Sequence, residues 1–135
     1  MTEGSCVHFA EGDYGLVLHA PEPYPNGFGY HHLIELCGGP FRGTIDATTY
    51  LNVLAISRFR DALIQLYQNL TGEARLEYEN FELSFVGDGR GHILVRVKAM
   101  AGRNMTTRLT YEFGLDQTQL PEAIGSLARL TSGRA

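Results

Sequence analysis

The sequence has few cysteines, no long apolar stretch and no excess of basic residues, and each shortage argues against a class of protein. The two cysteines, Cys6 and Cys37, lie on separate predicted strands, and without a secretion signal we expect reduced thiols rather than a disulfide. No apolar run approaches the roughly 20 residues that span a bilayer. The net charge of −4 argues against a general nucleic-acid-binding protein, which is normally basic. We therefore expect no membrane insertion and no nucleic-acid binding.

The amino-terminal residues MTEGSCVHFAEGD also lack the basic and apolar regions of a signal peptide, so we expect a cytoplasmic location. A length of 135 residues, with 44% apolar and 19% charged residues, is ordinary for one globular domain. The chain shows no internal repeat and no linker. We therefore predict a single domain over residues 1–135.

One stretch, residues 57–70, has the pattern of a long amphipathic helix. We expect Ser57 to cap its start and Gly72 to take the left-handed turn that ends it. The apolar face of this helix consists of Phe59, Leu63, Leu66, Tyr67 and Leu70. Such a face must be buried, and the surrounding sequence offers only a sheet as its partner.

Most of the remaining chain alternates apolar and polar residues, as strands do. The predicted strands cover 6–10, 15–20, 30–37, 41–49, 74–86, 92–101 and 107–113. The alternation changes phase around Glu79 and Asn80, which predicts a turn or a β-bulge there. A weaker amphipathic helix follows at 119–130, with Asp116 or Thr118 as its cap. We predict an α+β fold with about seven antiparallel strands, the long helix on the apolar sheet face and a shorter C-terminal helix.

The segment PEPYPNGFG, residues 21–29, is predicted to be an irregular loop because its prolines and glycines disfavour helix and central strand. Loops often carry binding residues, so Tyr24 and Phe28 are candidate partner contacts. Alternatively, these aromatic rings pin the loop to the side of the domain. A pocket between the sheet and this loop, with Tyr30 nearby, is the basis of a second hypothesis in which the protein binds a small ligand.

No pattern in the sequence indicates catalysis or a cofactor. The segment GDGRG at 87–91 is followed by strand residues, so it predicts a hairpin turn rather than a phosphate loop. Cys6, His8 and His19 could approach one another if the first two strands pair, but zinc-ligand spacings are absent and we expect surface histidines. A nucleophile motif is also missing, and the carboxylates are scattered. We therefore expect no enzyme activity, no metal and no cofactor.

Four glutamates gather after the long helix and are a further candidate for partner binding. They are Glu73, Glu77, Glu79 and Glu82. An exposed acidic run can attract a basic protein partner. Arg75 interrupts the negative charge, so the alternative is a solvated strand surface.

Several motifs in the last two-thirds of the chain resemble those of the WapI-type immunity proteins. An apolar helix runs into LxGEAxL, a strand begins Gly-His-Ile, and an L-x-[FY]-x-[FY] strand leads to Asp-Gln-Thr-x-Leu and a final helix. In this sequence the motif residues include Gly72; Gly91 and His92; and Asp116, Gln117 and Thr118. Phe41 and Gly43 also fit the pattern.

The resemblance implies a small cytoplasmic bacterial protein that protects against a contact-dependent toxin. The expected partner is the cognate toxin domain, and the expected mechanism is non-enzymatic occlusion. The shared motif positions are architectural in character and do not identify the residues that contact a toxin.

Overall fold

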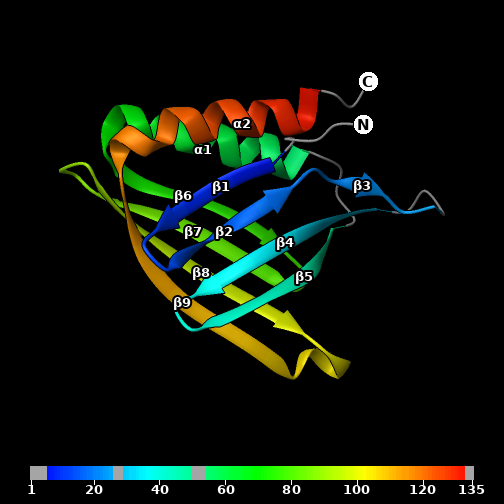
Figure 1. Cartoon of the computed structure of the whole chain (residues 1–135). Helices are drawn as coiled ribbons and strands as arrows, with labels where there is room; N and C mark the ends of the chain where they lie inside the picture. Colours follow the sequence, from blue (N-terminus) through cyan, green and yellow to red (C-terminus); the bar gives the residue numbers. More distant parts are fainter. Residues whose placement is uncertain (1–5, 26–28, 50–53, 133–135) are drawn as a thin grey trace.

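The computed structural model describes residues 6–25, 29–49 and 54–132. They form two antiparallel sheets, with two helices lying together along one side (Figure 1). Phe28 lies outside the described residues. The predicted α+β class, the long helix on an apolar sheet face and the shorter C-terminal helix are confirmed.

The first sheet, sheet A, has the strand order β1–β2–β4–β5. Its strands are β1 (Cys6–Glu11), β2 (Tyr14–His19), β4 (Tyr30–Gly38), β5 (Phe41–Thr49) and the two-residue β3 (Glu22–Pro23). Strand β3 pairs with β4 beyond the end of β2, so it prolongs the β2 position of the sheet. The proline-rich segment therefore contains a short strand that its composition did not predict.

The second sheet, sheet B, is a four-stranded meander in chain order. Its strands are β6 (Thr71–Tyr78), β7 (Phe81–Asp88), β8 (His92–Ala101) and β9 (Thr107–Asp116). The change of phase at Glu79–Asn80 is a turn between β6 and β7 rather than a bulge. The predicted count of about seven strands is therefore too low, since residues 74–86 belong to two strands and β3 adds a short one.

The two helices are α1 (Leu54–Asn69) and α2 (Leu120–Ser132), and short 3-10 turns occupy Arg103–Met105 and Gln117–Gln119. Helix α1 starts earlier than predicted, so Ser57 lies inside its first turn and is not its cap. The left-handed residue after the helix is Leu70, with φ of 65°, while Gly72, with φ of 111°, already belongs to β6. The chain reverses sooner than expected because Leu70 adopts a conformation usually left to glycine.

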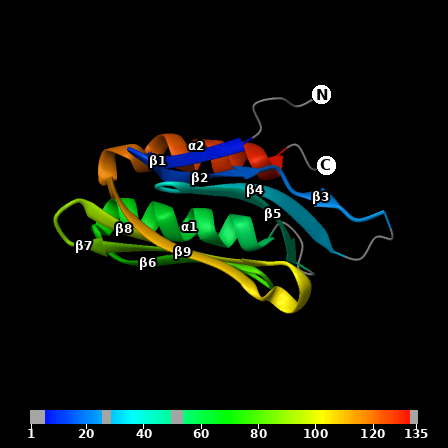
Figure 2. The same cartoon turned by 60° about the horizontal axis from the view of Figure 1, so that its bottom comes forward.

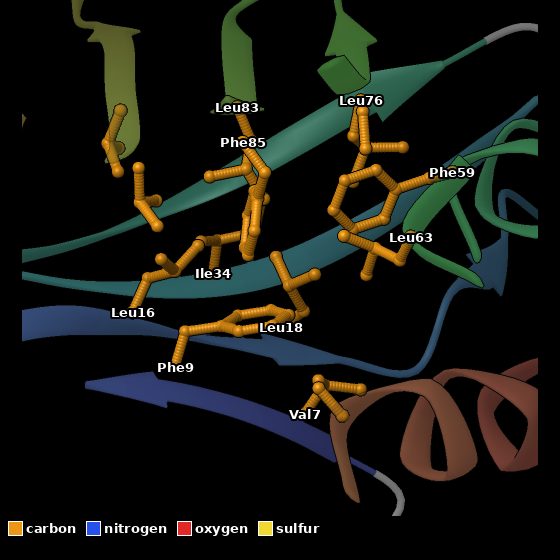
Figure 3. Packing of buried hydrophobic residues seen from close by; sticks show 14 of the residues in the cluster. Val7, Phe9, Leu16, Leu18, Ile34, Phe59, Leu63, Leu76, Leu83 and Phe85 are labelled. Atoms are coloured by element: carbon orange, nitrogen blue, oxygen red, sulfur yellow. The ribbon is translucent and has the colours of Figure 1, made fainter. Parts of the chain in front are cut away.

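The core lies where the inner faces of the two sheets meet α1 (Figure 3). Phe9 of β1 meets Phe85 of β7 edge to face, with ring centroids 4.9 Å apart. Phe59 of α1 meets the same Phe85 ring at 5.5 Å. One aromatic side chain of sheet B thus contacts both sheet A and the helix, so the alternating apolar residues of both sheets are buried in one cluster.

The order of four strand positions and one helix occurs twice along the chain, once β3 is taken as an extension of β2. No sequence repeat accompanies this structural repeat. Helix α1 follows the first sheet but packs against β6 of the second, and α2 follows the second sheet but packs against β1 and α1. Figure 2 shows this exchange, with α1 beside sheet B and α2 beside β1. Each repeat unit therefore supplies the helix that covers the other.

Two polar contacts cross between the sheets inside this core. The Tyr111 hydroxyl of β9 donates to the carbonyl of Gly15 at 2.6 Å and accepts from the N–H of Cys37 at 3.3 Å. His32 of β4, only 2% exposed, lies 3.0 Å from the carbonyl of His19 through Nδ1 and 2.9 Å from the Tyr78 hydroxyl through Nε2. The expectation that the histidines lie at the surface is therefore wrong for His32.

Candidate functional site

The outer face of sheet B carries the predicted acidic run and is closely ion-paired. Arg75 contacts Glu73 at 3.6 Å and Glu77 at 2.9 Å, and it also pairs with Glu82. The hydrogen bond to Glu82 and the neighbouring carboxylates raise the pKa of the Arg75 guanidinium. Arg75 thus forms ion pairs with three of the four glutamates, and a basic partner would have to compete with Arg75 for these carboxylates.

Two further ion pairs lie on the same face of sheet B. Arg96 contacts Glu112 at 2.8 Å, and Lys98 lies 4.0 Å from Glu82. The fourth glutamate, Glu79, lies exposed in the β6–β7 turn, where its N–H donates to the carbonyl of Thr48 at 3.2 Å. Positive and negative side chains alternate across this face.

Tyr24 is half-buried against sheet A. Its hydroxyl lies 2.9 Å from the Thr48 hydroxyl of β5, and its ring stacks on His31 with centroids 4.8 Å apart. The alternative in which Tyr24 pins the loop agrees with this geometry. Five hollows in the described part of the surface are lined by residues outside the 21–25 segment.

The outer face of sheet A collects most of the histidines and both cysteines. The cross-strand register and alternation place on this face Cys6, His8, Val17, His19, His31, Leu33, Glu35, Cys37, Arg42, Thr44 and Asp46. His19 Nε2 lies 2.5 Å from Glu35 Oε2, and His31 Nδ1 lies 2.9 Å from Asp46 Oδ1. We call this set of side chains the sheet A face.

The same face contains a hollow with a volume of about 500 Å³. It extends over β1, β2, β4 and β5. Its lining combines the half-buried Val17 and Cys37 with the exposed Asp13, Glu35 and Arg42. An apolar floor with a charged rim is the ordinary composition of a binding surface.

The predicted approach of Cys6, His8 and His19 occurs only in part. Cys6 Sγ lies 3.3 Å from His8 Nε2, and Cys6 is opposite His19 in the β1–β2 register. The His19 ring, however, is bound to Glu35. Among the described residues, no group of three or more His, Cys, Asp or Glu side chains is arranged to hold a metal ion.

The glycine-rich segment and the Asp-Gln-Thr motif meet at one end of sheet B. Gly91 has φ of 100°, its carbonyl accepts from the Gln117 N–H at 2.8 Å, and a Cβ there would lie 2.8 Å from Gln117 Oε1. Asp88 accepts from the N–H groups of Arg90 and His92, and these bonds lower the pKa of the Asp88 carboxyl. Because the Asp88 carboxylate already accepts hydrogen bonds from these two N–H groups, they do not form an open phosphate cradle, and the segment is a hairpin turn.

Asp116 rather than Thr118 caps the segment that leads into α2. Its carboxylate accepts from the Thr118 N–H at 3.4 Å, and its own N–H donates to Gln119 Oε1 at 2.9 Å. This reciprocal pair is a capping box. The motif residues Gly91, Asp116 and Gln117 therefore join β8, β9 and α2, whereas the His92 side chain is exposed.

The motifs recognised in the sequence belong to a match that extends over most of the chain. The sequence model of the Immunity protein WapI-like family matches residues 32–132. The chain belongs to this WapI-like family. The match covers β4 to α2, so it includes both helices and the whole of sheet B of this WapI-like protein.

Other comparisons do not extend this assignment. No curated protein sequence matches the WapI-like protein. A solved structure titled "Crystal structures of trypanosoma bruciei MRP1/MRP2" is similar at 10% sequence identity, with 92% of this chain and 79% of that chain covered and a TM-score of 0.48. In the described part of the WapI-like protein, neither helix is long and apolar enough to cross a membrane.

Proposed function

We propose that this WapI-like protein is an immunity protein that binds the toxic domain of a bacterial contact-dependent toxin and neutralises it by occlusion in the cytoplasm. The family match over residues 32–132 carries this proposal. The ion-paired outer face of sheet B and the hollowed sheet A face both offer surface to a protein partner, and no step of the mechanism requires catalysis.

The first experiment identifies the partner from the neighbouring gene. If the open reading frame immediately upstream encodes a large protein with a variable C-terminal toxin domain, that domain is expressed with and without the WapI-like protein. We expect co-expression to restore growth and the two proteins to purify as a complex. A toxin domain that stays lethal and unbound contradicts the proposal.

The stoichiometry of inhibition separates occlusion from catalytic inactivation. An occluding protein abolishes toxin activity only when its concentration reaches that of the toxin, whereas an enzyme inactivates many toxin molecules per copy. We expect the toxin to regain full activity when the complex is separated in denaturant and the toxin is refolded. A toxin whose mass has changed after exposure to the WapI-like protein contradicts occlusion.

The surface predicted from the sequence is tested in the same complex. If Glu73, Glu77 and Glu82 bind the toxin, the toxin must break their ion pairs with Arg75. Replacing them by glutamine, together with Glu79 in the turn, then weakens binding. Tyr24→Phe tests the predicted loop contact, since it removes the hydroxyl that bonds Thr48 and leaves the ring in place.

A further inference from the structure

We infer that the sheet A face is the surface that receives the toxin, and that its partner surface is basic. This inference rests on the proposed function, since it names the interface and the partner chemistry of the same immunity protein. Three independent properties of the sheet A face carry it: its charge, the partners of its carboxylates, and its shape.

The excess negative charge of the chain is concentrated in its first part. Residues 1–53 contain six acidic residues and Arg42 as the one basic residue, whereas residues 54–135 contain nine acidic and ten basic residues. Residues 1–53, which include all strands of sheet A, therefore carry a net charge of −5 and the rest of the chain +1; on the sheet A face and at its rim, Glu35, Asp46 and Asp13 outnumber Arg42. A field of one sign attracts a partner of the opposite sign and raises the rate of encounter.

The carboxylates of the two outer faces have different partners. On sheet B, Glu77, Glu82 and Glu112 contact arginine or lysine, which are charged at neutral pH. On the sheet A face, Glu35 and Asp46 contact the imidazole rings of His19 and His31, and among the described residues neither carboxylate forms an ion pair with an arginine or lysine. The carboxylates of the sheet A face therefore keep a charge that a guanidinium or ammonium group of a partner can satisfy.

The shape of the sheet A face suits a side chain inserted from a partner. The hollow of about 500 Å³ has Glu35 and Asp13 at its rim and Val17 and Cys37 among its lining. Leu33, 48% exposed, lies opposite Asp46 in the β4–β5 register and adds apolar surface beside the carboxylates. Binding energy in protein interfaces concentrates at such places, where a large side chain such as arginine fills a recess lined by apolar and charged groups.

The two natural cysteines allow a test on the unmodified protein, because Cys6 and Cys37 both belong to the sheet A face and both are half-buried. The rate of alkylation by N-ethylmaleimide is measured for each thiol by peptide mass spectrometry, with and without the toxin domain. We expect the toxin to slow the alkylation of Cys37, which lines the hollow, by about tenfold or more, as for a group inside a desolvated interface.

A matched thiol on the opposite face provides the control. Thr110 is exposed and lines the ion-paired outer face of sheet B, so a Thr110→Cys variant reports that side. We expect its alkylation rate to be the same in the free protein and in the complex. Protection of the new thiol with unchanged reactivity of Cys37 overturns the inference.

Charge-removing variants test the partner chemistry. Glu35→Gln with Asp46→Asn removes two charges from the sheet A face, and Glu77→Gln with Glu112→Gln removes two from sheet B. We expect the first pair to raise the Kd for the toxin at least about tenfold at low salt and to flatten its salt dependence. The second pair is expected to change the Kd by no more than about twofold.

The outcomes distinguish this inference from the proposed function. If the wild-type protein neither binds nor neutralises the toxin, the proposed function fails. If it binds, but the sheet B pair weakens the complex and the sheet A pair does not, the inference is wrong and the function stands. If the sheet A variant loses its circular dichroism spectrum, the alkylation measurement on the wild-type protein decides instead.

Discussion

At the scale of single residues, the buried His32 side chain makes the stability of the fold depend on pH. Burial lowers its pKa from the ordinary value of 6.5 to about 4, although the hydrogen bond with the His19 carbonyl acts in the opposite direction. The ring lies between that carbonyl and the Tyr78 hydroxyl. A neutral ring that donates through Nδ1 and accepts through Nε2 satisfies both partners, and protonation removes the acceptor.

The first prediction concerns the pH dependence of unfolding. Between pH 6.5 and pH 4 the unfolded chain binds a proton at His32 and the folded chain does not, so the free energy of unfolding falls as the pH falls through this window. The loss reaches about 3 kcal/mol near pH 4. Urea unfolding at several pH values measures it, and a His32→Asn variant, which does not titrate, shows how much belongs to this ring. A His32 that titrates near 6.5 by NMR contradicts the prediction.

A second prediction at this scale concerns the Tyr111 hydroxyl. It bridges the carbonyl of Gly15 and the N–H of Cys37, which are register partners in β2 and β4, and burial raises its pKa to about 12. We expect Tyr111→Phe to lower the free energy of unfolding by about 1–3 kcal/mol because it removes both hydrogen bonds between this hydroxyl and the backbone of sheet A. Tyr67→Phe is the control, since the Tyr67 side chain is 39% exposed although the sequence placed it on the apolar face of the helix, and we expect a change within about 0.5 kcal/mol. Equal effects of the two variants contradict this account.

At the scale of elements, the hairpin between β7 and β8 depends on the backbone conformation of Gly91. We expect Gly91→Ala to destabilise the fold by about 1–3 kcal/mol, because φ of 100° strains an L residue and the new Cβ meets Gln117. Gly43→Ala is the matched control, since nothing lies within 4 Å of its Cβ position and no positive φ is required there. Thermal unfolding compares them. A Gly43→Ala variant as unstable as Gly91→Ala contradicts the prediction.

The capping box before α2 gives a second prediction for elements. Removing the carboxylate in Asp116→Ala costs about 1 kcal/mol of stability, as for other N-cap substitutions. Thr118→Ala removes the other side chain that the sequence allowed as a cap, and we expect a change within about 0.5 kcal/mol. Chemical denaturation of both variants decides which residue is the cap in solution.

The sequence predicted the elements better than their arrangement. Alternation located almost every strand, because one face of each sheet is buried and the other is wet. It did not show that the strands form two sheets, because register between distant strands leaves no local signal. The buried His32 was missed for the same reason, since its partner Tyr78 lies on the other sheet. The left-handed conformation of Leu70 was not predicted, because glycine, here the nearby Gly72, ordinarily adopts it.

The candidate surface was predicted less well than the fold. Glu35 and Asp46 lie in the predicted strands 30–37 and 41–49, but only the pairing of β1, β2, β4 and β5 shows that they share a face with three histidines and both cysteines. The acidic run on β6 and β7 was visible in the sequence because its members are close together. Arg75 of β6 pairs in part with Glu82, which lies on the neighbouring strand β7.

At the scale of the whole molecule, the exchange of helices predicts that the two repeat units unfold together. Leu127 is fully buried in α2, and α2 packs against β1 and α1. We expect Leu127→Ala to cost about 2–5 kcal/mol. We also expect native-state hydrogen exchange in β4 and in β8 to accelerate by the same factor, because a single cooperative unfolding event exposes both sheets. Acceleration confined to β6–β9 shows that the units open separately.

The same exchange has a consequence for how the chain can be divided. A cut at Leu70, between α1 and β6, leaves two fragments of the same element order, each carrying a helix whose apolar side faces water until the other fragment arrives. Neither fragment contains the helix that covers its own sheet. When the two fragments bind each other, every contact of the intact chain is restored, and only the cut peptide bond is missing. Under the proposed function, this WapI-like protein can be expressed as two inactive halves, so that protection depends on both being present in one cell.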